Sequence, residues 1–138
     1  MKRLILLLTV VISIISCSSN EYTIIGTWIL VDSREEYYKD GELISWEIED
    51  EEAIGGKTVF EEYGRGYDIH GEKNKNFIWD IREGKLYISY ENHIDYADDC
   101  FNIDYINKVE MKVSNSRNYN YNSDFDTKIF SLKFRRVK

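Results

Sequence analysis

Hydrophobic and polar residues alternate in short runs along the chain from Thr23 onward. The runs are rich in β-branched and aromatic residues, and Gly, Asn and Asp separate them, which is typical of β-strands joined by turns. No long helical period appears. For the acidic segment 47–54 the alternatives are one turn of helix and an exposed loop, and its run of acids favours the loop. The pattern therefore predicts an all-β domain. Its strands are expected at 23–33, 42–48, 57–63, 65–71, 76–82, 85–91, 100–106, 108–114 and 127–137.

Several junctions between these strands carry the chemistry of tight turns. Lys39-Asp40-Gly41, Gly64-Arg65-Gly66 and Arg82-Glu83-Gly84 contain glycines that supply the positive φ of hairpin turns. Short connections make sequential strands neighbours, so an antiparallel up-and-down meander is expected. The chain contains no Pro, so no position within the strands lacks a backbone donor.

The alternation assigns one face of each strand to the interior. A meander with one buried face in strand after strand closes into a barrel of about eight strands, and an open sandwich is the competing architecture. The interior of such a barrel either fills with side chains or holds one small ligand. The aromatic residues assigned to the interior are the candidate ligand-lining residues: Phe77, Trp79, Tyr90, Phe101, Tyr105, Phe130 and Phe134.

The N-terminus carries a different pattern. Lys2 and Arg3 precede an uncharged apolar run, residues 4–15, which ends at Ser16-Cys17. A basic start, a short apolar stretch and a small residue indicate a secretory signal peptide, since a transmembrane helix needs ~20 apolar residues. Residues 14–17 resemble the bacterial lipobox, which implies cleavage after residue 16 and lipidation of Cys17. Residues 17–22 would then be a lipidated tether to a cell-envelope membrane, and the outer membrane of a Gram-negative bacterium is expected.

The charge of the chain limits the kinds of partner it can bind, and its cysteine content limits the disulfides it can form. The chain has a net charge of −7, and loss of Lys2 and Arg3 with the leader makes it −9. This charge argues against nucleic acid, because phosphate binding needs clustered Lys and Arg. With Cys17 lipidated, Cys100 has no partner for an internal disulfide. The neighbouring residues Asp98 and Asp99 oppose formation of a reactive thiolate.

Five segments together resemble the small lipocalin-like domains found in lipoproteins of Bacteroidetes-type bacteria. The first begins with Gly26-Thr27-Trp28, which is similar to the Gly-x-Trp signature of lipocalins. The segments are GTWILV (26–31), KDG (39–41), KTVFEEYGRGY (57–67), FIWDIREGKLYI (77–88) and FSLKFRRV (130–137). The resemblance implies a lipocalin-like β-barrel over residues 23–138, lipid-anchored and generally without an assigned activity.

The resemblance also implies a barrel floor. In lipocalins the Trp of the first strand closes one end of the barrel and an Arg of the last strand covers it. Here that Trp is Trp28, and the alternation that points Phe134 inward selects Arg136 rather than Arg135. We expect Gly26 where the strand bends and lacks room for a Cβ. A sealed floor would leave only the opposite end for ligand entry.

The sequence gives little evidence for catalytic or metal-binding residues. Asp68 and His70 share one strand face, as do His93 and Asp95, but both pairs are expected to be exposed, and two histidines make a poor zinc set. The acidic run lacks the spacing of a calcium loop. No Ser lies in a nucleophile elbow. We therefore expect no enzyme activity, no metal and no cofactor.

Two functions stay open. The first is non-enzymatic binding of a small apolar or amphipathic ligand in the barrel. The second is a protein- or glycan-interaction module of a cell-envelope surface complex, with a packed barrel. It would use the Tyr-, Asn- and Ser-rich connection 114–126, because loop tyrosines suit recognition. The interior volume distinguishes the two.

Overall fold

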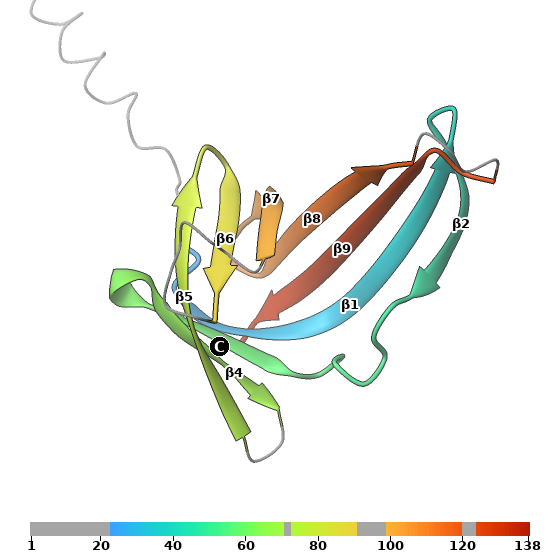
Figure 1. The fold of residues 1–138 in the computed structure, drawn as a ribbon. Helices are drawn as coiled ribbons and strands as arrows, with labels where there is room; N and C mark the ends of the chain where they lie inside the picture. Colours follow the sequence, from blue (N-terminus) through green and yellow to red (C-terminus); the bar gives the residue numbers. More distant parts are fainter. Residues whose placement is uncertain (1–22, 71–72, 91–98, 120–123) are drawn as a thin grey trace, which may run out of the picture.

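The computed structural model of the chain describes residues 23–70, 73–90, 99–119 and 124–138. Antiparallel strands make up most of these residues, and one short 3-10 turn is present (Figure 1). Among these residues there is no helix with the length and hydrophobicity needed to span a membrane. The elements are β1 Gly26–Lys39, β2 Glu42–Ile48, β3 Lys57–Glu61, η1 Glu62–Gly64, β4 Arg65–His70, β5 Lys73–Arg82, β6 Lys85–Ser89, β7 Asp99–Ile106, β8 Glu110–Asn118 and β9 Thr127–Arg136.

The strands form one closed barrel, which confirms the predicted fold class. Neighbours follow the order β2-β1-β3-β4-β5-β6-β7-β8-β9, and β1 also pairs with β9. Strand β1 pairs with β3 through residues 26–29 and with β2 through residues 34–39, both on the same edge. The barrel therefore contains eight strands, β1 and β3 to β9, and β2 is an additional strand alongside the second half of β1.

Strand β1 is longer than expected. The predicted strand ends at residue 33, whereas β1 continues through the charged residues Arg34, Glu35 and Glu36 to Lys39. Strand β8 likewise continues to Asn118, into a stretch expected to be loop. The far halves of β1, β8 and β9 extend beyond the rest of the barrel together with β2 (Figure 1). We call this extension, residues 33–39, 42–48, 114–118 and 127–131, the wing.

Strand β2 is exposed along its whole length. Leu43, Ile44, Trp46 and Ile48 each expose about half of their surface, from 46 to 52%. Arg34 lies over the ring of Trp46, with its Cζ 4.5 Å from the ring centroid. Strand β2 therefore adds little to the core, and the barrel is closed without it.

The predicted inward face is correct for most strands and wrong at Tyr105. Ile103 faces Val113 across β7 and β8, but the register shifts at the next residue, so that Tyr105 faces Lys112 and Ile106 faces Met111. This bulge moves Tyr105 to the outer surface, where it is 37% exposed. A bulge reverses the two-residue alternation beyond it, and the alternation alone does not reveal where one occurs.

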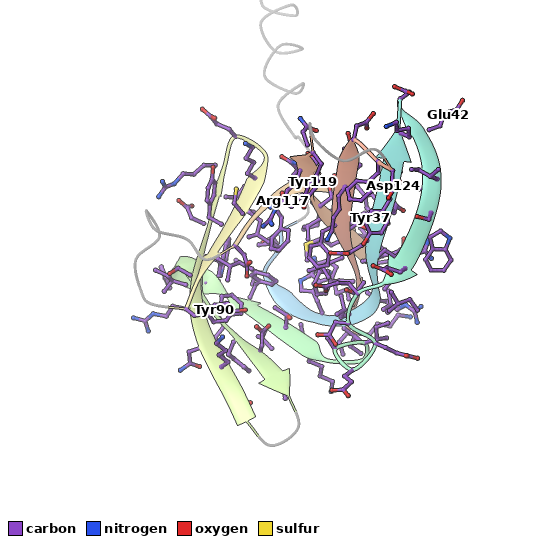
Figure 2. All side chains as sticks on the ribbon, turned by 45° about the vertical axis from the view of Figure 1, so that its right-hand side comes forward. Tyr37, Glu42, Tyr90, Arg117, Tyr119 and Asp124 are labelled. Atoms are coloured by element: carbon purple, nitrogen blue, oxygen red, sulfur yellow. The ribbon has the colours of Figure 1, made fainter. Side chains whose placement is uncertain are left out.

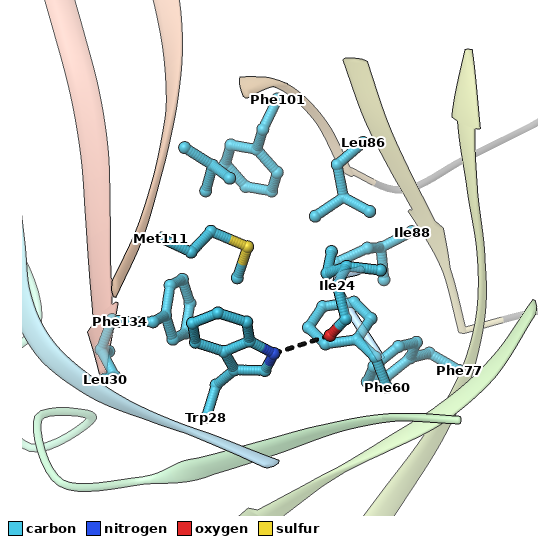
Figure 3. Packing of buried hydrophobic residues seen from close by; sticks show 11 residues of the cluster. Ile24, Trp28, Leu30, Phe60, Phe77, Leu86, Ile88, Phe101, Met111 and Phe134 are labelled. Atoms are coloured by element: carbon cyan, nitrogen blue, oxygen red, sulfur yellow. Dashed lines mark hydrogen bonds between the residues drawn. The ribbon is translucent and has the colours of Figure 1, made fainter. Parts of the chain in front are cut away.

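The core fills the end of the barrel around Trp28 (Figure 3). Buried side chains from seven of the barrel strands meet there, and Trp28 and Met111 have no exposed surface. The members are Ile24, Trp28, Leu30, Phe60, Phe77, Leu86, Ile88, Phe101, Met111, Val113 and Phe134. The other end of the barrel, toward the wing, is not filled in this way.

Candidate functional site

The floor of the barrel brings together Trp28 and Arg136, as the resemblance implies. The two residues are cross-strand partners on β1 and β9, and the Cζ atom of Arg136 lies 4.2 Å from the centroid of the Trp28 ring. Arg136 donates from Nη1 to the carbonyl oxygen of Ile25 at 2.8 Å and from Nη2 to that of Thr23 at 2.6 Å. The indole Nε1 of Trp28 donates to the carbonyl oxygen of Ile24 at 2.7 Å. One Arg and one Trp thus hold residues 23–25 across this end.

Gly26 is required at the floor for two reasons. Its φ is +137°, a conformation that side-chain-bearing residues rarely adopt. A Cβ at this position would also lie 2.7 Å from Nη1 of Arg136. Gly26 therefore makes room for the Arg136 guanidinium beside the bend in the chain.

Above the floor lies an inner cavity of about 250 Å3. Aliphatic and aromatic side chains of the core form most of its wall, among them Leu30, Phe101, Met111 and Phe134. Four of the predicted lining residues contact this cavity: Tyr90, Phe101, Phe130 and Phe134. The alternation identified these because their strands are regular up to those positions.

Three predicted lining residues do not contact the cavity. Phe77 is buried, but its ring packs edge-on against Phe60 and Tyr90, with centroids 5.5 and 5.9 Å apart. Trp79 packs edge-on against Phe60, and its Nε1 donates to the carbonyl oxygen of Arg65 at 2.7 Å. Both residues therefore pack against Phe60, which lines the cavity, and Phe77 also packs against Tyr90. Tyr105 lies on the outer surface because of the bulge in β7.

An outer cavity of about 260 Å3 adjoins the inner one, and both are lined by Glu49, Asp99, Phe101 and Phe130. The outer cavity is lined further by charged and amide side chains of the wing. Figure 2 shows Tyr37, Arg117 and Tyr119 grouped at the wing, with Tyr90 on the other side of the view. The remaining lining residues of the outer cavity are Glu35, Asn115, Arg117 and Lys128.

On the inner faces of the three adjacent strands β8, β9 and β1, the residues become more polar from the floor toward the wing. Strand β9 carries Phe134, Leu132, Phe130 and then Lys128. On β8 the order is Met111, Val113, Asn115 and Arg117, and on β1 it is Leu30, Ser33 and Glu35. The site is therefore apolar next to the floor and charged next to the wing.

The charged end is organised around Glu35. Nζ of Lys128 lies 2.5 Å from Oε1 of Glu35, and the Tyr37 hydroxyl lies 2.8 Å from Oε2 of Glu35 and 2.6 Å from Oε1 of Glu47. Partial burial raises the pKa of Glu35, but Lys128 and Tyr37 outweigh it and hold that pKa below its ordinary value of 4.5. Hydrogen bonding to Glu47 and Glu35 raises the pKa of Tyr37, so its hydroxyl stays a donor. Glu35 is thus an ionised and already paired carboxylate.

Asp68 lies inside the barrel, which contradicts the expectation that it is exposed. It lines the inner cavity, where the Thr58 hydroxyl donates to Oδ1 at 2.7 Å and the Tyr90 hydroxyl donates to Oδ2 at 2.8 Å. The side chain of His70, as well as His93 and Asp95, lies outside the described residues. Among the described residues, no three His, Cys, Asp or Glu side chains gather as metal ligands would.

Sequence reasoning missed the polar residues of the cavity wall: Ser33, Glu49, Asp50, Asp68 and Asp99. Ser33 is almost fully buried, at 1% exposure, because an extra residue in β1 between Leu30 and Asp32 turns it inward. Glu49 lies beside it, since the backbone N–H of Glu49 donates to the carbonyl oxygen of Ser33 at 3.1 Å. The expected exposed acidic loop therefore contributes to the site.

Comparison with known proteins identifies no relative of this chain. No family model matches it, and neither the curated proteins nor the solved structures contain a significant match.

Proposed function

We propose that this chain is a lipid-anchored, non-enzymatic binding protein whose barrel takes one small amphipathic molecule. The observation that carries the proposal is the pair of adjoining cavities, apolar next to the floor and charged next to the wing. Each cavity alone is slightly smaller than a typical ligand pocket, which has ~300 to 1,000 Å3, and the two together fall within that range. Because Trp28 and Arg136 occupy the floor, the ligand enters from the wing end with its apolar part leading.

The competing function, an interaction module on a fully packed barrel, has less support. Its premise is a filled interior, whereas an inner cavity of about 250 Å3 remains among the core side chains. Part of the connection assigned to recognition is also strand β8, whose residues 115 and 117 line the outer cavity. We therefore favour ligand binding.

Binding of 1-alkanols of increasing length, measured by titration calorimetry, tests the proposal. Each CH2 group buried against the apolar wall contributes about 0.8 kcal/mol, so the dissociation constant should fall about fourfold per carbon until the cavity is full. Leu132→Trp places a large ring in the inner cavity and should weaken 1-octanol binding at least about tenfold. Absence of any alkanol binding to the unmodified protein contradicts the proposal.

Lys112→Trp is the matched control for this experiment. Lys112 pairs with Lys133 on the outer face of β8, and it does not contact either cavity. The same ring added there should leave alkanol binding unchanged. Equal losses for Leu132→Trp and Lys112→Trp would mean that the first variant acts through stability and not through the cavity.

The proposed anchor rests on the order of residues 2–17, which is basic, apolar, Ser and Cys. Two or three acyl chains on Cys17 would hold the protein on a membrane, whereas a single chain binds only marginally. Cys17→Ser should abolish metabolic labelling with a radioactive fatty acid and release the protein from the membrane fraction. Cys100→Ser should change neither result. Labelling that persists in Cys17→Ser would show that the anchor has been misassigned.

A further inference from the structure

The junction between the two cavities has an unusual composition. The four residues that line both cavities are two carboxylates, Glu49 and Asp99, and two aromatic rings, Phe101 and Phe130. The two rings lie next to each other, with centroids 6.2 Å apart. A ligand that fills the inner cavity and emerges toward the wing passes these four side chains. The junction is therefore where the apolar part of a ligand ends and its polar group begins.

The charge around the inner cavity is negative. Its wall contains four acids, Glu49, Asp50, Asp68 and Asp99, against the single base Lys57. The outer cavity adds two bases, Arg117 and Lys128, and one further acid, Glu35, which engages Lys128. Over both cavities five acids therefore face three bases. A ligand anion at the junction would face the like charges of Glu49 and Asp99. A cation would be attracted.

Aromatic rings reinforce this preference. The face of a phenyl ring carries negative quadrupole density, and a cation within about 6 Å of the ring centroid is attracted to it. Carboxylates with neighbouring aromatic faces are the groups that recognise ammonium ions. Phe101 and Phe130 supply the rings, and Glu49 and Asp99 supply the carboxylates.

A second and independent observation is the hydroxyl of Ser33. Ser33 lines the inner cavity at 1% exposure, and its Oγ has no hydrogen-bond partner among the described residues. A buried hydroxyl without a partner is costly, so native structures usually provide one. Ser33 lies beside Glu49, whose backbone N–H donates to the Ser33 carbonyl oxygen. The unpartnered hydroxyl therefore lies in the wall of the inner cavity, near the segment that carries Glu49.

We propose that the ligand is an amphipathic amine. Its apolar body lies in the inner cavity, and its ammonium group lies at the junction between the carboxylates of Glu49 and Asp99, against Phe101 and Phe130. This inference rests on the proposed function, because it names the chemical class of the ligand for the same cavity.

Three probes with the same eight-carbon chain test the inference: 1-octylamine, 1-octanol and octanoate. At neutral pH the amine is protonated, as Lys is with its pKa of about 10.4, and octanoate is ionised. In titration calorimetry at low salt, octylamine should bind at least about tenfold more tightly than octanol, and octanoate more weakly than octanol. The preference for octylamine should fall as salt is added.

Two variants of the acidic loop locate the charge effect. Glu49→Gln should weaken octylamine binding about five- to tenfold and leave octanol binding unchanged. Glu51→Gln is the matched control, because it removes the same charge two residues away, from an exposed residue that does not contact either cavity. It should change neither affinity by more than about twofold.

The outcomes separate this inference from the proposed function. If octanol binds and octylamine binds no more tightly, the cavity holds ligands but the amine assignment is wrong. If octanoate binds most tightly, the cations Arg117 and Lys128 decide the charge preference and the inference is overturned. If none of the three probes binds, the proposed function itself fails.

Discussion

Trp28→Ala should lower the free energy of unfolding by about 3–5 kcal/mol, the usual cost of removing a large buried aromatic side chain. Trp28 has no exposed surface, contacts the Arg136 guanidinium and donates to the Ile24 carbonyl oxygen. A domain of this size has only about 5–15 kcal/mol of stability, so the variant should be close to unfolding. Urea titration followed by far-UV circular dichroism measures the loss. A cost below about 1 kcal/mol would show that Trp28 does not organise the floor.

Arg136→Ala should cost less, about 2 kcal/mol, because it removes one cation–π contact and two hydrogen bonds from a charged donor to carbonyl oxygens. It should also increase hydrogen exchange at residues 23–25, which those bonds hold. Arg135→Ala, next to it on the exposed face, should cost less than about 0.5 kcal/mol. Equal costs at positions 135 and 136 would contradict the predicted floor.

The double variant Trp28→Ala/Arg136→Ala tests whether the two residues act together. Residues in contact show coupling energies of about 0.5–3 kcal/mol, so the double variant should lose less stability than the sum of the single losses. Strictly additive losses would mean that the 4.2 Å contact contributes nothing of its own. Trp28→Phe combined with Arg136→Ala separates the loss of the ring face from the loss of side-chain volume.

The parts of the fold that followed from the sequence are those set by regular alternation. Strand β5 pairs with β6, and β8 with β9, without a register shift, so residues two apart share a face. Phe134 and Arg136 were therefore placed correctly. Tyr105 was misplaced because a bulge adds one residue, which leaves no mark in the hydrophobic pattern. The end of β1 was missed because Glu35 lies in a strand yet is stabilised by Lys128 and Tyr37, contacts made only in the folded barrel.

The candidate site was predicted only at its apolar end. Phe101, Phe130 and Phe134 lie in strands whose alternation identifies the inner face. The polar wall comes from residues that look exposed in the sequence. Glu49 follows the exposed strand β2, and it reaches the cavity because residues 49–56 run alongside the irregular part of β1. A charged residue that faces a cavity and one that faces solvent have the same local sequence pattern, and only the assembled barrel distinguishes them.

Gly66→Ala is the second substitution with a large expected effect, and it concerns a glycine whose role the sequence suggested only in part. Gly66 was interpreted as a turn residue beside Gly64, but it lies in β4, between Phe60 of β3 and Phe77 of β5. A Cβ at this position would lie 2.5 Å from the Val59 carbonyl oxygen and would also overlap the Phe77 ring. The overlap with Val59 involves backbone of the neighbouring strand, which a rotamer change does not relieve. We expect a loss of about 3 kcal/mol, at the upper end for overpacking.

Two comparisons give this prediction its control. Gly41→Ala changes a turn glycine with φ +81° and no atom within 4 Å of the added Cβ, so it should cost only the backbone strain, about 1–2 kcal/mol. Phe77→Leu in the Gly66→Ala background removes the ring that the new methyl group meets and should recover part of the loss, so the two changes should not be additive. Urea titration of the unmodified protein, the single variants Gly66→Ala, Gly41→Ala and Phe77→Leu, and the double variant decides between the alternatives. If Gly66→Ala destabilises the protein no more than Gly41→Ala does, the close packing of Phe77 against Gly66 does not stabilise the barrel wall. The contact between Phe77 and Tyr90 would then not be what holds Tyr90 at the cavity.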